Sequence, residues 1–253
     1  IEIMKEGRES GMKSGGLYAY PVMSNSLGWA YHELCHFDRA IDYNNLALES
    51  IQESLGPDTS DLFEMASQTQ VNLGENYLMI GDMKKAHENL ELVYESAKNP
   101  AYYLGRTRWY PRCLLGLSEL WLQKGDMDEA EGFLSELFEH LWTNKFPYKK
   151  YQVRAWLLRS NILSEKRHMA DAETELNRAL GLAMQLDNPT LLWKTHQAAG
   201  NLLLKQGRCK EARAEFQTAL KVVHAIAEKL TDVALKEGYL QSDLIKEMIS
   251  QVE

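Results

Sequence analysis

Small and apolar residues recur at steps of three and four along most of the chain, with polar residues between them. In the clearest instance, Leu73 and Tyr77 precede a Gly81-Asp82 pair, and Ala86 and Leu90 follow it. A helix of 3.6 residues per turn places such residues on one face, and a glycine-polar pair favours a tight turn. This stretch therefore predicts two amphipathic helices joined into a helical hairpin.

The same arrangement occurs five times, and one alanine marks each occurrence. These marker alanines are Ala40, Ala86, Ala130, Ala172 and Ala212. Four of them are preceded at equal distances by the same kind of residues: an apolar residue, then Gly or Ser, then an aromatic residue or leucine. The interval is 46 residues between Ala40 and Ala86 and 40 residues between Ala172 and Ala212. The pattern predicts an array of five hairpins.

This pattern resembles the tetratricopeptide repeat (TPR), in which Trp, Leu-Gly, Tyr, Ala and Phe recur at fixed offsets. The hairpins around Ala86 and Ala212 carry it best, and Phe216 supplies the aromatic residue after Ala212. The usual repeat has about 34 residues. The longer repeats here, and the stretch 48–61 between the first two, resemble the long-period variety of kinesin light chains and many bacterial signalling proteins. The resemblance implies an all-α fold, a right-handed superhelix of TPR helical hairpins, or α-solenoid.

The array is predicted to occupy residues 1–253 as a single domain. Residues 1–16 are expected to form a half-hairpin, residues 21–229 the five TPR-like hairpins, and residues 230–253 a capping segment. Proline disfavours helix at the residue before it, which predicts linkers at Gly56-Pro57-Asp58, Asn99-Pro100, Phe146-Pro147 and Asn188-Pro189. Because residue 1 is Ile, we expect the chain to begin within a longer protein.

Charge and composition narrow the classes of partner. The net charge of -8 disfavours nucleic acid and anionic membranes as partners. No apolar run reaches the roughly 20 residues that a bilayer crossing needs, and no signal peptide is recognised. The three cysteines are odd in number and far apart, so we expect no disulfide framework. We predict a cytoplasmic protein.

One motif suggests catalysis. His32-Glu33-x-x-His36 matches H-E-x-x-H, which on one helix can bind zinc with Glu33 as general base. In the repeat register, however, His36 occupies the position of Asp82 and Asp126, at the turn of the hairpin. A turn removes the shared helical face, so a zinc hydrolase is the remote alternative. We predict no enzyme activity, no cofactor and no metal.

Candidate binding residues follow from the repeat. In TPR proteins the first helix of each hairpin lines a concave groove, so the resemblance implies that residues at equal offsets stack along it. Arg112, Arg154 and Lys194 share one such offset. Arginine can bind a carboxylate through two hydrogen bonds, and asparagine can bind a peptide backbone as donor and acceptor. The predicted ligand-binding residues are Asn72, Arg112, Arg154, Asn161, Lys194, Asn201 and Lys205; the alternative is that they are ordinary solvated side chains.

We therefore predict a protein–protein interaction or sensor module. Its partner would be a protein or peptide segment, or another ligand, with acidic or carboxylate groups that enter the concave groove. The tail, residues 226–251, resembles the closing segment of large bacterial signalling proteins, which implies the C-terminal part of a larger regulatory protein. A constitutive scaffold or self-association domain, present as a homo-oligomer, is the alternative.

Overall fold

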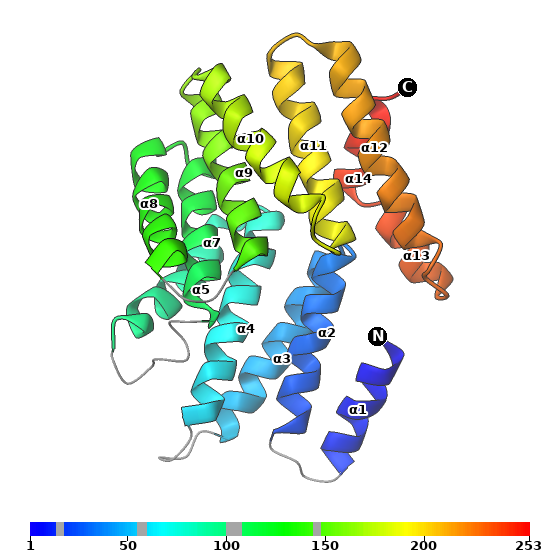
Figure 1. Cartoon of the computed structure of the whole chain (residues 1–253). Helices are drawn as coiled ribbons and strands as arrows, with labels where there is room; N and C mark the ends of the chain where they lie inside the picture. The colour runs from blue at the N-terminus through cyan, green and yellow to red at the C-terminus, as the bar shows by residue number, and fades with distance from the viewer. Residues whose placement is uncertain (14–17, 55–59, 100–107, 144–147) are drawn as a thin grey trace. The chain divides into compact units, whose positions relative to one another are not determined.

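The computed structural model describes residues 1–13, 18–54, 60–99, 108–143 and 148–253. Every regular element in these ranges is an α-helix (Figure 1). The N-terminal helices are α1 (Glu2–Lys13), α2 (Ala19–Glu33), α3 (Phe37–Ser54), α4 (Ser60–Met79) and α5 (Met83–Ala97). Next come α7 (Tyr110–Gln123), α8 (Met127–Thr143), α9 (Lys149–Glu165), α10 (Met169–Ala183), α11 (Pro189–Lys205) and α12 (Cys209–Ala227). The chain closes with α13 (Val233–Leu240) and α14 (Asp243–Ser250). The all-α prediction is confirmed.

The turn between paired helices has the same backbone geometry five times. The residue five positions before each marker alanine has a positive φ: 79° at Gly81, 83° at Gly125 and 74° at Gly207, and also 58° at Cys35 and 64° at Arg167. Glycine adopts this left-handed conformation freely, whereas a residue with a Cβ does so at a cost. The turn thus keeps its geometry at the two positions where the sequence has no glycine.

Small residues allow the two helices of a hairpin to approach closely. All five marker alanines are 0% exposed. A Cβ on Gly74 would lie 2.6 Å from Leu90 Cγ, and a Cβ on Gly200 would lie 2.6 Å from two ring atoms of Phe216. The apolar residue four positions after the marker alanine therefore packs directly on the backbone of the preceding helix.

The chain divides into two compact units, Ile1–Leu120 and Trp121–Glu253. In the first unit α1 packs on α2, α2 on α3 and α4, and α4 on both α3 and α5. In the second unit consecutive helices from α8 to α12 pack on one another, and α13 and α14 pack on α12. Within that tail Leu235, Tyr239, Ile245 and Met248 are buried, as a segment that covers the last hairpin requires. The single array over residues 1–253 stays a prediction.

One predicted linker has a clear structural basis. Asn188 Oδ1 accepts a hydrogen bond from the backbone N–H of Leu191 at 2.9 Å, and Pro189 is the first residue of α11. This is the usual way to begin a helix. The predicted linkers at 56–58, Pro100 and 146–147, and residues 14–16 of the predicted half-hairpin, lie outside the described residues. Across the described ranges, no helix has the length and apolarity needed to span a membrane.

Candidate functional site

The H-E-x-x-H motif does not form the helical face that zinc binding needs. Helix α2 ends at Glu33, and Cys35 has φ 58°. The His32 imidazole is hydrogen-bonded through Nδ1 to Asn76 Oδ1 at 2.8 Å, whereas the His36 ring lies beside Tyr31. Among the described residues, no three metal-binding side chains gather into a cluster.

Asn72 and Arg112, two of the predicted binding residues, lie together in the first unit. Arg112 Nη2 donates to Asn72 Oδ1 at 2.8 Å, and the guanidinium forms an ion pair with Glu75. The exposed fractions are 3% for Asn72, 9% for Arg112 and 7% for Glu75. The two predicted binding residues thus meet, and their hydrogen bonds are made inside the unit.

These residues continue into a buried network of four asparagines, Asn25, Asn44, Asn72 and Asn76, which we call the amide network. Asn25 Oδ1 accepts from Asn72 Nδ2 at 2.8 Å and from Asn44 Nδ2 at 2.9 Å. Asn76 Nδ2 donates to Asn44 Oδ1 at 3.2 Å. None of the four is more than 3% exposed. The network joins α2, α3 and α4 by side-chain hydrogen bonds that water does not reach.

Asn44 holds a position that is apolar in the other hairpins. It lies four residues after its marker alanine, where the others have Leu90, Leu134, Leu176 and Phe216. Its amide fits because residue 28 is glycine: a Cβ there would lie 2.2 Å from Asn44 Nδ2. The polar residue in an apolar column was the sequence signal for this network.

The remaining predicted residues lie in the second unit and form what we call the α9–α11 stripe: Arg154, Asn161, Lys194, Asn201 and Lys205. Arg154 and Asn161 are seven residues apart on α9, as Lys194 and Asn201 are on α11, and this spacing places each pair on one face. Asn161 and Asn201 are exposed, and Arg154 and Lys194 are half-buried.

One contact aligns the two halves of the stripe. Lys205 Nζ donates to Glu165 Oε1 at 2.5 Å. Both residues stand seven positions before their marker alanines. The residues at this offset therefore meet across α9 and α11, as the repeat register predicts. Lys194 Nζ lies 5.7 Å from the Trp193 ring centroid, a favourable cation–π arrangement.

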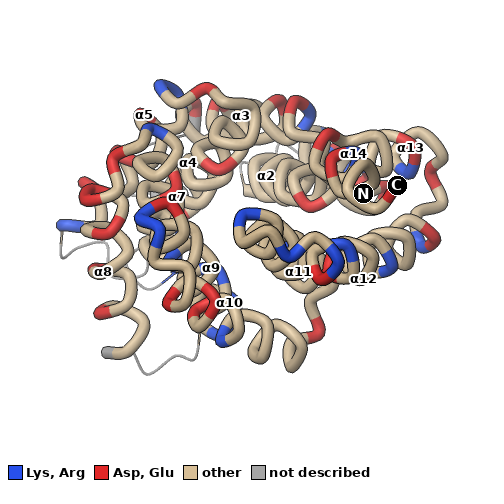
Figure 2. Tube along the Cα trace, turned by 90° about the horizontal axis from the view of Figure 1, so that it is seen from above, with Lys and Arg blue, Asp and Glu red and all other residues tan. Residues whose placement is uncertain are grey.

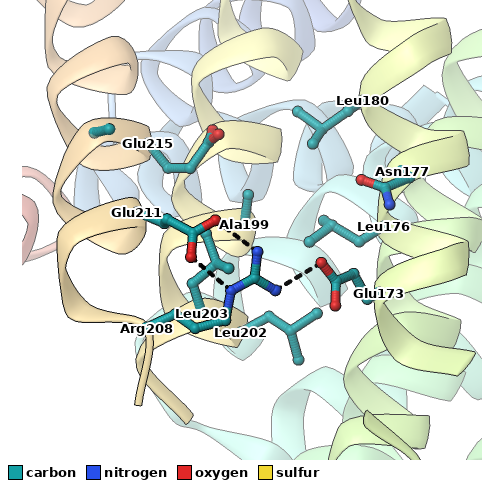
Figure 3. Close-up of a pocket in the computed structure, with 11 residues that line it drawn as sticks. Glu173, Leu176, Asn177, Leu180, Ala199, Leu202, Leu203, Arg208, Glu211 and Glu215 are labelled. Atoms are coloured by element: carbon teal, nitrogen blue, oxygen red, sulfur yellow. Dashed lines mark hydrogen bonds and ion pairs between the residues drawn. The ribbon is translucent and has the colours of Figure 1, made fainter. Parts of the chain in front are cut away.

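A cavity of about 260 Å³ lies between α10, α11 and α12 in the same unit (Figure 3), and sequence reasoning missed it. Leu176, Leu202 and Leu203 line its apolar floor. Figure 3 shows Glu215 of α12 and Asn177 of α10 facing each other across the opening.

Arg208 is the central polar side chain of this cavity. Its Nη1 donates to Glu173 at 2.7 Å, and its Nε and Nη2 donate to the two carboxylate oxygens of Glu211 at 2.8 and 2.6 Å. Hydrogen bonds from Arg208 are the main cause that lowers the pKa of Glu173 and of Glu211, and bonds from the two glutamates raise the pKa of Arg208. All three groups are therefore charged at neutral pH.

The repeat register contained a signal for this role of Arg208. It stands where Asp82 and Asp126 cap α5 and α8, each accepting a backbone N–H at 3.1 Å. Arg208 makes no such cap, and a cation at a helix N-terminus is electrostatically unfavourable. An arginine at this position indicates that its side chain serves another contact, here the one to α10.

Comparison with known proteins identifies the type of fold. No protein-family model matches the chain, and a search of curated protein sequences finds no match. Among solved structures, the chain is similar to BtubC (BKLC) from P. vanneervenii, with a TM-score of 0.60, 18% identity and 90% of each chain covered. It is also similar to TTC0263, a thermophilic TPR protein in Thermus thermophilus, with a TM-score of 0.52, 22% identity, and 88% and 98% of the two chains covered. The chain thus has the all-α helical-repeat fold of TPR structures.

Proposed function

We propose that this chain, with its TPR-type fold, is a protein-interaction module whose α9–α11 stripe binds an acidic or carboxylate-bearing segment of a partner protein. The observation that carries the proposal is the charge of the two helices. Glu165 is the one acidic residue in α9 and α11. The same two helices contain six basic residues: Lys149, Lys150, Arg154, Arg159, Lys194 and Lys205. This basic pair of helices belongs to a chain whose net charge is -8.

The geometry of the stripe suits an extended or helical segment. Residues seven apart on a helix are separated by about 10 Å along its axis, and neighbouring helices pack about 8–10 Å apart. Arg154 and Lys194 supply charge, while Asn161 and Asn201, both exposed, supply amide donors and acceptors. Lys205 is already paired with Glu165, so it contributes to ligand binding by exchanging that partner for a ligand carboxylate.

The test is a pull-down from lysate of the source cell at low and moderate salt. The stripe variant is Arg154→Glu/Lys194→Glu/Lys205→Glu. The matched control, Lys84→Glu/Lys210→Glu/Lys246→Glu, makes the same charge change at basic residues on α5, α12 and α14. We expect a partner that the wild type and the control retain and the stripe variant loses. A partner retained equally by all three proteins would show that the stripe is solvated surface.

A regulatory role is the finer version of this proposal, supported by the resemblance of residues 226–251 to the closing segment of signalling proteins. In a repeat array each hairpin contacts its neighbours, so a ligand that bridges α9 and α11 favours one packing of the two. In a longer protein that contains this array and an effector, stripe substitutions should change effector output. A constitutive scaffold would instead lose its partner without any change of output.

A further inference from the structure

The second unit has another surface, on a different face of α11 from the stripe. A second cavity, of about 310 Å³, lies between the turn that joins α10 to α11, the start of α11 and the C-terminal part of α12. Its apolar walls include Leu186, Leu192, Val222 and Ile226. It therefore shares helices α11 and α12 with the cavity around Arg208.

Helix periodicity shows that the two cavities are parts of one valley. On α12, Glu211 and Glu215 line the first cavity, and Val222 and Ile226 line the second. Their steps of four, seven and four residues keep one helical face, and Lys229 follows just after the helix ends. On α11 the same holds for Leu192, Ala199 and Leu203, which are seven and four residues apart. The valley thus runs along α12, with α11 as its floor. Its other wall is α10 at the first cavity and the α10–α11 turn at the second. From Arg208 to Lys229 it measures about 30 Å at 1.5 Å per residue.

The tail does not cover this valley, because its contacts fall on other faces of the two helices. Gln197 Nε2 donates to the backbone oxygen of Leu244 at 3.4 Å, and Arg213 Nη2 donates to that of Glu253 at 3.2 Å. Gln197 follows Leu192 by five residues, as Arg213 follows Arg208, which corresponds to well over a quarter turn around the helix. The contacts of α14 and of the last residue therefore lie outside the valley.

The two ends of the valley carry opposite charge. At the first end, Glu173, Glu211 and Glu215 outnumber Arg208, and Glu215 Oε2 is 2.7 Å from His196 Nδ1. At the second end, Lys221 and Lys229 stand at the rim against a single carboxylate, Asp187. The charge of the valley therefore changes sign along its length.

The size of the cavities indicates what kind of ligand enters them. Sites for small molecules commonly enclose about 300–1,000 Å³, so cavities of about 260 and 310 Å³ each suit one large side chain. Two such cavities along one valley, with a floor of leucines, match the anchor residues of an amphipathic helix.

We propose that the valley binds an amphipathic helix of a partner protein, with Lys or Arg over Glu211 and Glu215 and an apolar anchor with a nearby carboxylate between Leu192 and Lys229. This site is separate from the α9–α11 stripe and has the opposite preference at its first end. Its success or failure in an experiment is therefore distinguishable from that of the stripe.

The test is selection from a displayed library of helical peptides about 20 residues long, enough to span 30 Å at 1.5 Å per residue. The peptides have leucine on one face and random Lys, Glu, Gln and Ser elsewhere. Selection is on the wild type, with removal of peptides that bind Ala214→Trp. Ala214 is exposed and lines the first cavity, so tryptophan fills the cavity without removing a buried contact.

We expect enriched peptides with basic residues at one end and acidic residues at the other. Their affinity should fall about tenfold for Glu211→Lys/Glu215→Lys. It should stay unchanged for Glu88→Lys/Glu91→Lys, an equal charge change on α5, and for Lys194→Glu on the stripe. No enrichment over Ala214→Trp, enrichment without charge polarity, or equal loss in the α5 control would overturn the proposal.

Discussion

The two units of this chain join their hairpins by different polar contacts. In the unit Ile1–Leu120 most of these contacts are buried: the amide network and the Arg112–Glu75 pair have at most 9% exposure, whereas the Arg108–Glu64 ion pair lies at the surface. In the unit Trp121–Glu253 they are ion pairs at the surface. Lys166 bonds Asp128 and Glu131, Lys205 bonds Glu165, and Arg208 bonds Glu173. Figure 2 shows charges of both signs along α9 to α12 and almost none on α2.

The buried contacts favour one packing of the helices, whereas the surface ion pairs can exchange their partners. A buried hydrogen bond is costly to leave unmade, so the amide network permits one register of α2, α3 and α4 and penalises others. Exposed ion pairs contribute little to stability and exchange readily with ligand groups. Both candidate binding surfaces lie in the second unit, where charged side chains can change partners without disturbing a core.

The largest effect is expected from Arg112→Met in the first unit. It removes the guanidinium that balances the Glu75 carboxylate, and breaking a buried pair on one side costs about 3 kcal/mol or more. Urea unfolding monitored by circular dichroism measures the loss. The double variant Arg112→Met/Glu75→Gln should recover much of it. If Arg112→Met were no worse than Arg208→Met, the contrast between the units would be wrong.

A smaller loss, about 2 kcal/mol, is expected from Asn44→Ala, because Asn25 and Asn76 each lose a buried hydrogen bond. The network consists of neutral amides, so the loss should be equal in 0.05 and 1 M NaCl, although the Debye length falls from roughly 14 Å to 3 Å across this range. Unfolding at both salt concentrations checks this. A loss that disappeared at high salt would show that a charged contact, and not the amide network, causes it.

Much of the fold could be predicted from the sequence because its signals are local and repeated. The marker alanines and the Gly-polar turns each fix a hairpin through a few neighbouring residues, and the turn geometry persisted even at Cys35 and Arg167. The Glu165–Lys205 contact was likewise implicit in equal offsets. Because the pattern occurs five times, a departure from it at a single position did not change the predicted fold.

The partners of polar side chains were less predictable, because they depend on which elements pack together. Arg112 shares an offset with Arg154 and Lys194, but Glu75 and Asn72 of α4 lie within its reach and it is 9% exposed. The valley was missed because α12 and α10, which supply walls of it, are second helices, whereas the TPR resemblance implies a binding groove lined by first helices. Departures within a column, such as Asn44 and Arg208, were the most informative signals available.

Glycine substitutions in two of the turns are expected to stabilise the protein, and they again compare the two units. Arg167 is exposed with φ 64°, so Arg167→Gly should stabilise by about 1 kcal/mol, the cost of a Cβ in the left-handed region. Cys35 has the same geometry but is only 8% exposed, so Cys35→Gly also loses packing and should gain less. Thermal unfolding of the two variants gives the comparison. A larger gain from Cys35→Gly would mean that its side chain contributes nothing to the core.

The smallest effect is expected from Arg208→Gln, which removes a partly exposed contact between the start of α12 and α10. The pKa of Glu173 and of Glu211 is lowered, chiefly by hydrogen bonds from Arg208. A carboxylate whose pKa is lowered on folding adds stability above its ordinary pKa of 4.5, and this stability is lost as the pH falls through the lower, folded value. Hydrogen exchange in α10 and α12 should therefore be slightly faster in Arg208→Gln than in the wild type at pH 7 and low salt.

This difference in exchange rate should vanish in 1 M NaCl, where the Debye length is about 3 Å. It should also vanish in acid, once both glutamates are protonated. A difference that persisted under both conditions would mean that Arg208 acts by packing, and the second unit would then resemble the first.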